Sequence, residues 1–213
     1  MGEENNTDNV RSYDIIAERW EQNRRKRGLD PCIAELTEMI PPSGKILDIG
    51  CGTGYPIDVY LSDNGFSVTG IDPSEEMIRI ASRMNLKSAA FHRCGLFEFE
   101  SDTLFDAVIA FDSLFHIAPE RQEAIYPKIA GMLKPEGLFL FTHGRISDSV
   151  TGTMLGESFS YHALDEDRLQ KCLYENSLTP IWFFKDYEAP VTGRRDLLAL
   201  ARKSDTRREI KEG

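Results

Sequence analysis

Glycines and acids that could hold a nucleotide-like ligand stand close together in the first third of the sequence. Gly50, Gly52 and Gly54 follow a short apolar run, and glycines there let the backbone turn sharply and approach a ligand closely. Asp48 precedes this turn and puts a carboxylate beside the expected ligand, which suits positive charge better than a pyrophosphate. Asp72 ends a second apolar run and is placed to accept hydrogen bonds from ribose hydroxyls. Two acids therefore flank one glycine turn.

The glycine turn is predicted to connect a buried strand with a helix. The apolar run 46–49 is long enough for a strand, and Pro56 suits the first turn of a following helix. A dinucleotide-binding turn carries a third glycine three residues after the second one, but here that position is Tyr55. The glycine pattern therefore disfavours NAD as the ligand of this turn.

Two histidines are the candidate catalytic groups. The apolar run 105–111 predicts a central parallel strand covered on both faces, and His116 follows its end, where open α/β sheets bind ligands. His143 ends the next predicted strand. Imidazole titrates near neutrality, so either side chain could remove a proton from a reacting group. The alternative, that each is a hydrogen-bonded wall residue, remains open.

The N-terminal segment is predicted to supply helices that cover the site. Residues 1–9 are polar and predicted to be disordered, and the next residues place Tyr13 and Trp20 on one side of an amphipathic helix that can dock as a lid. The basic run 24–27 is interpreted as the solvated end of this helix, where cations meet the helix dipole favourably. A second helix is predicted to start at Pro31.

The second half of the chain is predicted to alternate helices and strands around one long loop. Residues 145–157 are rich in Ser, Thr and Gly without periodicity, which indicates a loop that covers the active site. The other expected elements are helices over 118–133 and 165–176, strands over 89–92, 138–142, 181–187 and 196–203, and a charged tail over 204–213.

The motifs resemble those of class I S-adenosylmethionine-dependent methyltransferases. The resemblance rests on the runs Leu47–Gly54, Ile71–Ser74 with Met77, Phe105–Ala110 and Leu133–Gly137, and it extends over residues 10–203. It implies an α/β fold: a Rossmann-like doubly wound, mostly parallel seven-stranded sheet with an antiparallel C-terminal edge strand pair. It also implies a single domain over 10–203, in which 10–44 form N-terminal lid helices.

The resemblance further implies S-adenosyl-L-methionine as the cofactor. Its binding residues are then expected to be Tyr13, Asp48, Gly50, Cys51, Gly52, Gly54, Asp72, Met77, Gly95, Leu96 and Phe111. The chain departs from the family after the third strand, where an acidic residue usually holds the adenine amino group but residues 93–96 contain none. Glu98 or Glu100 could substitute, or both could be solvated loop acids.

The composition of the chain limits which ligands and partners are expected. A chain of 213 residues with 41% hydrophobic content can form one domain, and its net charge of −10 disfavours nucleic acid and favours a small-molecule methyl acceptor. The four cysteines are far apart without a CxxC pair, so neither a metal site nor a disulfide framework is expected. No apolar run approaches a membrane span or signal peptide. We therefore expect a cytoplasmic monomer or homodimer.

These observations predict a methyltransferase of the EC 2.1.1 type that acts by in-line displacement on a small molecule. Such a transfer mainly requires orientation of donor and acceptor and exclusion of water, so a catalytic base is optional. Two alternatives remain: a non-catalytic S-adenosylmethionine-binding regulator and, less favoured, a nicotinamide-dependent oxidoreductase. Tyr55 and the lack of a Tyr-x-x-x-Lys motif disfavour the second.

Overall fold

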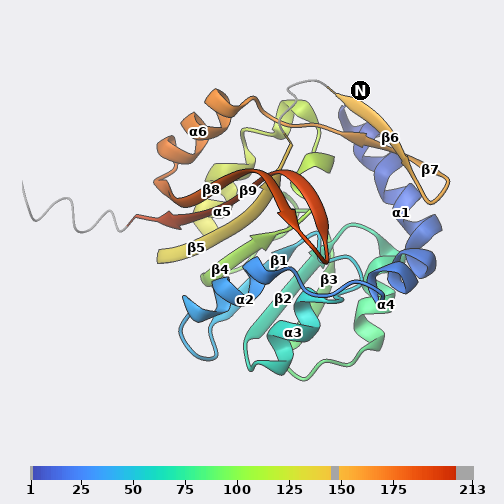
Figure 1. The fold of residues 1–213 in the computed structure, drawn as a ribbon, viewed down its shortest axis with the longest axis horizontal. Coiled ribbons are helices and arrows are strands. Elements are labelled where there is room, and N and C mark those ends of the chain that lie inside the picture. Colours follow the sequence, from blue (N-terminus) through green and yellow to red (C-terminus); the bar gives the residue numbers. More distant parts are fainter. Residues whose placement is uncertain (1, 145–148, 205–213) are drawn as a thin grey trace, which may run out of the picture.

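A seven-stranded sheet forms the centre of the computed structural model, which describes residues 2–144 and 149–204 (Figure 1). The strand order is β3-β2-β1-β4-β5-β9-β8; the first five strands run parallel, and β9 is antiparallel to both neighbours. The strands are β1 Lys45–Ile49, β2 Ser67–Asp72, β3 Ala89–Arg93, β4 Phe105–Ala110, β5 Leu133–His143, β8 Leu178–Ala189 and β9 Gly193–Lys203. This architecture confirms the predicted fold class.

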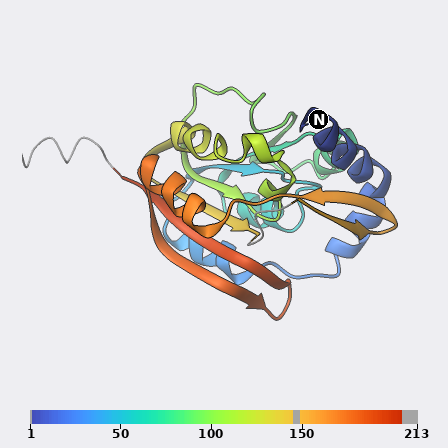
Figure 2. The ribbon, with the colours of Figure 1, turned by 90° about the horizontal axis from the view of Figure 1, so that it is seen from above.

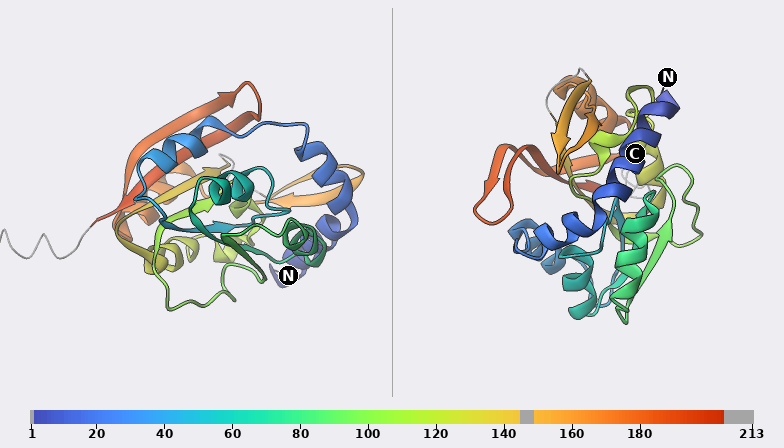
Figure 3. Two further views of the ribbon diagram at one scale, coloured as in Figure 1. Left: turned by 90° about the horizontal axis from the view of Figure 1, so that it is seen from below. Right: turned by 90° about the vertical axis from the view of Figure 1, so that its right-hand side faces the viewer.

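Helices cover both faces of the sheet (Figure 3). The helices are α1 Gly2–Arg24, α2 Pro31–Glu38, α3 Ile57–Asp63, α4 Glu75–Arg83, α5 Ile125–Met132 and α6 Glu166–Glu175, with short 3₁₀ turns η1 Leu114–His116 and η2 Pro119–Arg121. One core cluster joins α2 and α3 to one face of the sheet, and another joins α5 and α6 to the opposite face. Successive β1 residues contribute to different clusters, Ile46 to the first and Leu47 to the second, as strand alternation requires.

Side-chain caps explain where two of the helices begin. Asp30 accepts a hydrogen bond from the Cys32 amide at the start of α2, and Pro31 occupies the first turn. Ser74 likewise accepts from the Met77 amide at the start of α4. Because both caps are local in sequence, α2 before β1 and α4 after β2 begin at predictable points.

α1 lies across the carboxyl ends of the parallel strands, where it packs against α4 through Ala17, Met77 and Ile80 (Figure 3). The predicted disorder of residues 1–9 differs from the structure, in which α1 begins at Gly2. Asn9 is buried, and its amide group exchanges hydrogen bonds with the backbone of Ser160. Contacts from a distant strand thus hold a segment whose own composition is polar.

A two-stranded hairpin replaces the loop predicted over 145–157. β6 Val150–Met154 pairs antiparallel with β7 Glu157–Tyr161, and Figure 2 shows the hairpin beside α1. Leu155 and Gly156 form the two-residue turn, both with positive φ, as tight hairpins require. Residues 145–148, the start of the predicted loop, lie outside the described residues.

Two element boundaries also differ from prediction. The helix expected over 118–133 is divided into η2 and α5, because Pro127 is tolerated only in a first helical turn. β5 begins at Leu133 rather than at residue 138, and Glu136 with φ of 63° lies beside a register shift against β4. Most of the predicted tail, residues 205–213, lies outside the described part of the chain.

None of the helices in the described residues combines the length and apolar character needed to cross a membrane; α1, the longest at 23 residues, is polar.

Candidate active site

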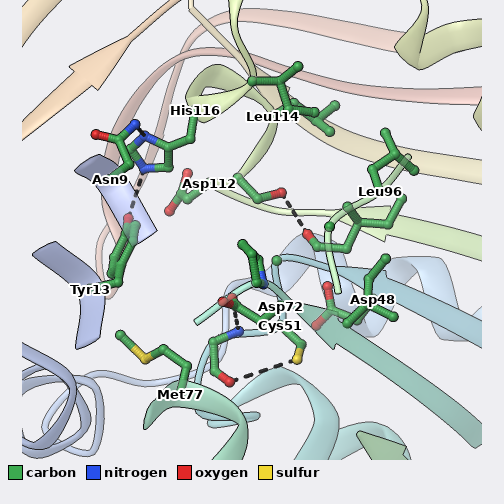
Figure 4. A pocket seen from close by; sticks show the side chains of 18 of the residues that line it. Asn9, Tyr13, Asp48, Cys51, Asp72, Met77, Leu96, Asp112, Leu114 and His116 are labelled. Carbon is green, nitrogen blue, oxygen red and sulfur yellow. Dashed lines mark hydrogen bonds between the residues drawn. The ribbon is translucent and has the colours of Figure 1, made fainter. Parts of the chain in front are cut away.

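A cavity of about 850 Å³ lies at the carboxyl ends of β1, β2 and β4, beneath α1 (Figure 4). It brings together most of the residues predicted to bind a cofactor and one of the two candidate histidines. These are Tyr13, Asp48, Gly50, Cys51, Gly52, Asp72, Met77, Gly95, Leu96, Phe111 and His116.

The glycine turn after β1 forms one wall of the cavity. Gly50 and Gly52 have φ of 73° and 57°, a region that disfavours residues with a Cβ. A Cβ at Gly50 would collide with Ser113. A Cβ at Gly52 would instead enter open space, since its nearest neighbour is Trp20 Nε1 at 3.8 Å. Gly52 is therefore where the backbone leaves room for a ligand.

Asp72 holds the glycine turn in place from the end of β2. Its Oδ2 accepts a hydrogen bond from the Gly52 amide at 3.0 Å, and its Oδ1 accepts from the Ser74 amide at 2.9 Å. Burial raises the pKa of Asp72 to about 6. A carboxylate has about four lone-pair sites, so these two hydrogen bonds leave Asp72 able to accept others from a ligand.

Asp48 lines the cavity but also faces a second buried acid, Asp58, in the first turn of α3. Neither Asp58 oxygen has a hydrogen-bond donor from the described residues. Burial raises the pKa of both carboxyls. Their contact is favourable when one carboxyl is protonated and donates to the other, as in carboxyl pairs that share a proton.

Asp58→Asn should therefore reduce the loss of stability with rising pH. The folded pair retains a proton that the unfolded chain releases above about pH 4. The stability that this pair contributes is therefore present at low pH and lost as pH rises. Relative to the variant, the wild-type free energy of unfolding should fall between pH 5 and 8 by up to about 1.4 kcal/mol per pH unit. Urea denaturation measures this difference.

Asp63→Asn is the matched control, because Asp63 is an exposed acid in the same helix. If the wild type and Asp58→Asn have parallel stability profiles across this pH range, the two carboxyls do not share a proton.

His116 lies in a partly buried network built from three separate elements (Figure 4). Its Nε2 is 2.8 Å from the Tyr13 hydroxyl of α1, and its Nδ1 is 3.1 Å from both Asn9 Nδ2 and the Ser160 carbonyl oxygen of β7. Burial lowers the pKa of His116 to about 4 and raises that of the Tyr13 phenol. Both groups are therefore neutral near pH 7.

The hydrogen bonds limit what His116 can do. A proton on Nδ1 would be donated to the Ser160 carbonyl, which leaves Nε2 to accept from the Tyr13 hydroxyl; the opposite tautomer would accept from Asn9 and donate to Tyr13. In either case both ring nitrogens have partners. The Tyr13 hydroxyl thus occupies His116 Nε2, and direct contact between His116 and an acceptor stays a prediction.

Two predicted site residues do not line the cavity. His143 is buried at the end of β5, which lies one strand farther from β1 than β4 does, and its Nδ1 is paired with the Gly144 carbonyl. Gly54 has φ of 76° and faces Met84, Phe91 and Asp58. Glycine is required at this position because the turn needs a positive φ and because a Cβ would lie 2.8 Å from Met84 Cε.

Arg24 and Trp20 also line the cavity, although the sequence pattern predicted no binding role for either residue. The Arg24 guanidinium lies 4.8 Å from the centre of the Trp20 ring and forms no ion pair with the described residues. The interpretation of run 24–27 as a solvated helix end is thus wrong for Arg24. The spacing of Arg24 from Tyr13 and Trp20 places all three on one helix face. This spacing is the sequence signal that could have identified Arg24 as a cavity residue.

Asp112, just past β4, is another cavity residue that local patterns do not reveal. It has φ of 56°, and its carboxylate receives two hydrogen bonds from Arg195 of β9, at 2.9 and 2.8 Å. Arg195 is 9% exposed and lies over the Phe111 ring. Because the pair joins residues distant in sequence, only the strand order brings it together.

No group of three or more His, Cys, Asp or Glu side chains in residues 2–144 and 149–204 is placed to hold a metal ion, and Cys32, Cys51, Cys94 and Cys172 are free thiols.

Comparison with known proteins finds similarity to methyltransferases in part of the sequence and in the fold. Residues 46–137 match the methyltransferase domain family. YqeM of Bacillus subtilis is 39% identical over 107 residues, which are 48% of this chain and 43% of YqeM. The chain thus spans less than half of the length of this curated relative.

Two solved structures have the same fold. The DhpI complex with S-adenosylhomocysteine has a TM-score of 0.68 and 24% identity, covering 94% of this chain and 97% of DhpI. The other is the 1,6-didemethyltoxoflavin-N1-methyltransferase of Burkholderia thailandensis, solved with 1,6-didemethyltoxoflavin and S-adenosylhomocysteine. It has a TM-score of 0.66 and 21% identity, and the match covers 92% of this chain and 88% of the Burkholderia chain. The chain thus has the fold of S-adenosylmethionine-dependent methyltransferases, and its residues 46–137 match the methyltransferase domain family, as the motifs indicated.

Proposed function

We propose that this protein transfers a methyl group from S-adenosyl-L-methionine to a small-molecule acceptor by in-line displacement. The observation that carries the proposal is the open space in front of Gly52, next to Asp72, in a cavity of about 850 Å³ covered by α1. Ligand pockets of about 300–1,000 Å³ suit small molecules. Covering such a site excludes water, which favours transfer over hydrolysis.

The residues present fit each part of this cofactor. The glycine turn offers close backbone approach for the methionine part, and Arg24, a cation without an ion-pair partner in the described residues, suits its carboxylate. Asp72 suits the ribose hydroxyls. Leu96 and Met77 give apolar surface for the base. When bound, the cofactor supplies a methyl group activated by a sulfonium.

Tyr13 and His116 provide a route for a proton if the acceptor must lose one. In the tautomer with a proton on Nδ1, Tyr13 donates to His116 Nε2 and its phenolic oxygen can accept a hydrogen bond from an N–H or O–H group. A proton taken up at the Tyr13 oxygen is then matched by transfer of the phenolic proton to His116. We therefore assign direct contact to Tyr13 and proton storage to His116, and give His143 no role.

Two experiments separate this proposal from its alternatives. A thermal-shift panel of S-adenosylmethionine, S-adenosylhomocysteine and NAD tests the oxidoreductase alternative, because only the first two should raise the melting temperature. Transfer of a labelled methyl group to a metabolite panel tests the non-catalytic regulator, which would bind the cofactor and methylate nothing. The Burkholderia protein, whose structure holds a heteroaromatic compound, supports including such compounds. We retain the cytoplasmic location and the monomeric or homodimeric state as proposals.

Asp72→Ala should weaken S-adenosylhomocysteine binding by about tenfold or more, because a charge-assisted pair of hydrogen bonds is worth roughly 1.5–3 kcal/mol. Calorimetry measures the change. Asp72→Asn keeps one acceptor oxygen for the Gly52 amide and should lose less affinity than Asp72→Ala. Unchanged affinity in both variants would remove Asp72 from the ribose site.

A further inference from the structure

The carboxyl pair of Asp48 and Asp58 lies between the cavity and the interior of the protein. Asp48 is 3% exposed and lines the cavity, whereas Asp58 is 0% exposed and is not among the lining residues. Apart from Asp48, no group in residues 2–144 and 149–204 donates a hydrogen bond to Asp58. A change of charge in the cavity therefore reaches Asp58 through Asp48.

The groups around the pair supply little positive charge. Asp72 of β2 faces Asp48 and adds negative charge, and the nearby Cys51 thiol stays protonated because burial raises its pKa. Among the described residues that influence Asp48, Arg24 of α1 is the only cation. In the proposed function Arg24 pairs with the carboxylate of the cofactor. The positive groups of a bound cofactor would then be the main cations near the pair.

The methyl donor and its product differ in positive charge. The glycine turn proposed to hold the methionine part begins two residues after Asp48. S-adenosylmethionine carries an ammonium and a sulfonium, whereas S-adenosylhomocysteine carries the ammonium and a neutral thioether. An opposite charge within about 4–6 Å of a carboxyl group favours its ionised form. The two ligands should therefore act differently on a proton that Asp48 shares.

We infer that Asp58 makes the site distinguish the methyl donor from the demethylated product, through the proton that it shares with Asp48. The pair releases this proton to the solvent when S-adenosylmethionine binds, which leaves two carboxylates near the sulfonium. The pair takes up a proton from the solvent after transfer, because the electrons of the broken bond stay on sulfur and neutralise it. The product is then held less tightly than the donor. This inference rests on the proposed cofactor.

Calorimetry in two buffers counts the released protons. Binding enthalpies are measured at about pH 7 in phosphate and in imidazole, and their dependence on the ionisation enthalpy of the buffer gives the number of protons released. The wild type should release about half a proton or more in excess with S-adenosylmethionine than with S-adenosylhomocysteine. This comparison of two ligands requires no variant.

Asp58→Asn should remove the excess that the wild type releases with S-adenosylmethionine. The asparagine amide can donate to Asp48, which then stays ionised and has no shared proton to lose. Asp72 and the amino groups of the ligands also titrate near neutral pH, but they do so in both proteins. Asp63→Asn is the matched control, because Asp63 is an exposed acid of the same helix, and it should release as many protons as the wild type.

Affinity should follow the same proton. A proton released on binding raises the affinity by about tenfold per pH unit. The ratio of the two dissociation constants, that of S-adenosylhomocysteine over that of S-adenosylmethionine, should therefore increase between about pH 6 and pH 8. The increase should be about three- to tenfold larger in the wild type than in Asp58→Asn.

The outcomes separate this inference from the proposed function. If the wild type binds neither compound, the proposed cofactor is wrong. If both compounds bind, but the wild type and Asp58→Asn release equal numbers of protons with S-adenosylmethionine, the role of Asp58 is refuted and the proposed function stands. If the wild type releases the same number with both compounds, the pair does not respond to the sulfonium, and discrimination by Asp58 is refuted.

Discussion

Gly52→Val should leave no detectable binding of S-adenosylhomocysteine at concentrations that saturate the wild type. The Cβ position of Gly52 points into the cavity with Trp20 Nε1 as its nearest neighbour at 3.8 Å, so the valine methyl groups would occupy ligand space. This substitution also strains the backbone, because Gly52 has φ of 57°. A non-glycine residue in that region costs about 1–2 kcal/mol. Calorimetry and thermal melting report the two effects separately.

Gly65→Val is the matched control for strain. Gly65 has φ of 83°, no atom lies within 4 Å of its Cβ position, and it is outside the cavity. This variant should lose stability but bind normally. Gly52→Asn adds a further comparison, since asparagine tolerates positive φ but still fills the space. Normal binding by Gly52→Val or Gly52→Asn would place the cofactor elsewhere.

Tyr13→Phe and His116→Ala should each lower the turnover rate by about 10² to 10⁴ once an acceptor is known, the range typical of general acid–base catalysis. The two groups form one hydrogen-bonded unit, at 2.8 Å, so the double variant should lose little more than either single variant. His116→Gln, which cannot store the proton, should resemble His116→Ala. Steady-state kinetics with saturating cofactor measures these effects.

Tyr161→Phe is the matched control, because Tyr161 packs 5.1 Å from the His116 ring without a hydrogen bond to it. Melting temperature and S-adenosylhomocysteine affinity should stay near wild type in Tyr13→Phe and His116→Gln. Full turnover in both variants would leave orientation and proximity as the mechanism.

The pH dependence of the rate offers a second check on His116. A base must be unprotonated, and burial lowers the pKa of His116 to about 4, so this group should remain competent throughout pH 6–8. The groups around it are Tyr13, Asp112 and His162. A histidine with an ordinary pKa would instead cause the rate to fall below about pH 6.5. If the wild-type rate falls below about pH 6.5 and the His116→Gln rate does not, the pKa of His116 is not lowered. His116 would then be more solvated than its packing indicates.

The sequence by itself determined the local elements and the family. Apolar runs place β1 and the end of β2, and Pro31 places the start of α2, within a residue of where they lie, since strand patterns and helix-start signals act between neighbours in the chain. Gly50, Gly52 and Asp72 could be identified for the same reason, because one strand-turn-helix unit and the next strand carry them all.

The tertiary structure decided which distant side chains share the cavity. Tyr13 meets His116 across 103 residues, and Arg195 meets Asp112 across 83, distances that no local periodicity encodes. The sheet order excludes His143, and packing against α1 turns a segment without clear periodicity into the β6–β7 hairpin. Arg24 and Glu98 had plausible solvated roles in the sequence. Their positions at the cavity depend on where α1 docks and on the space left by Gly95, which are results of packing between elements.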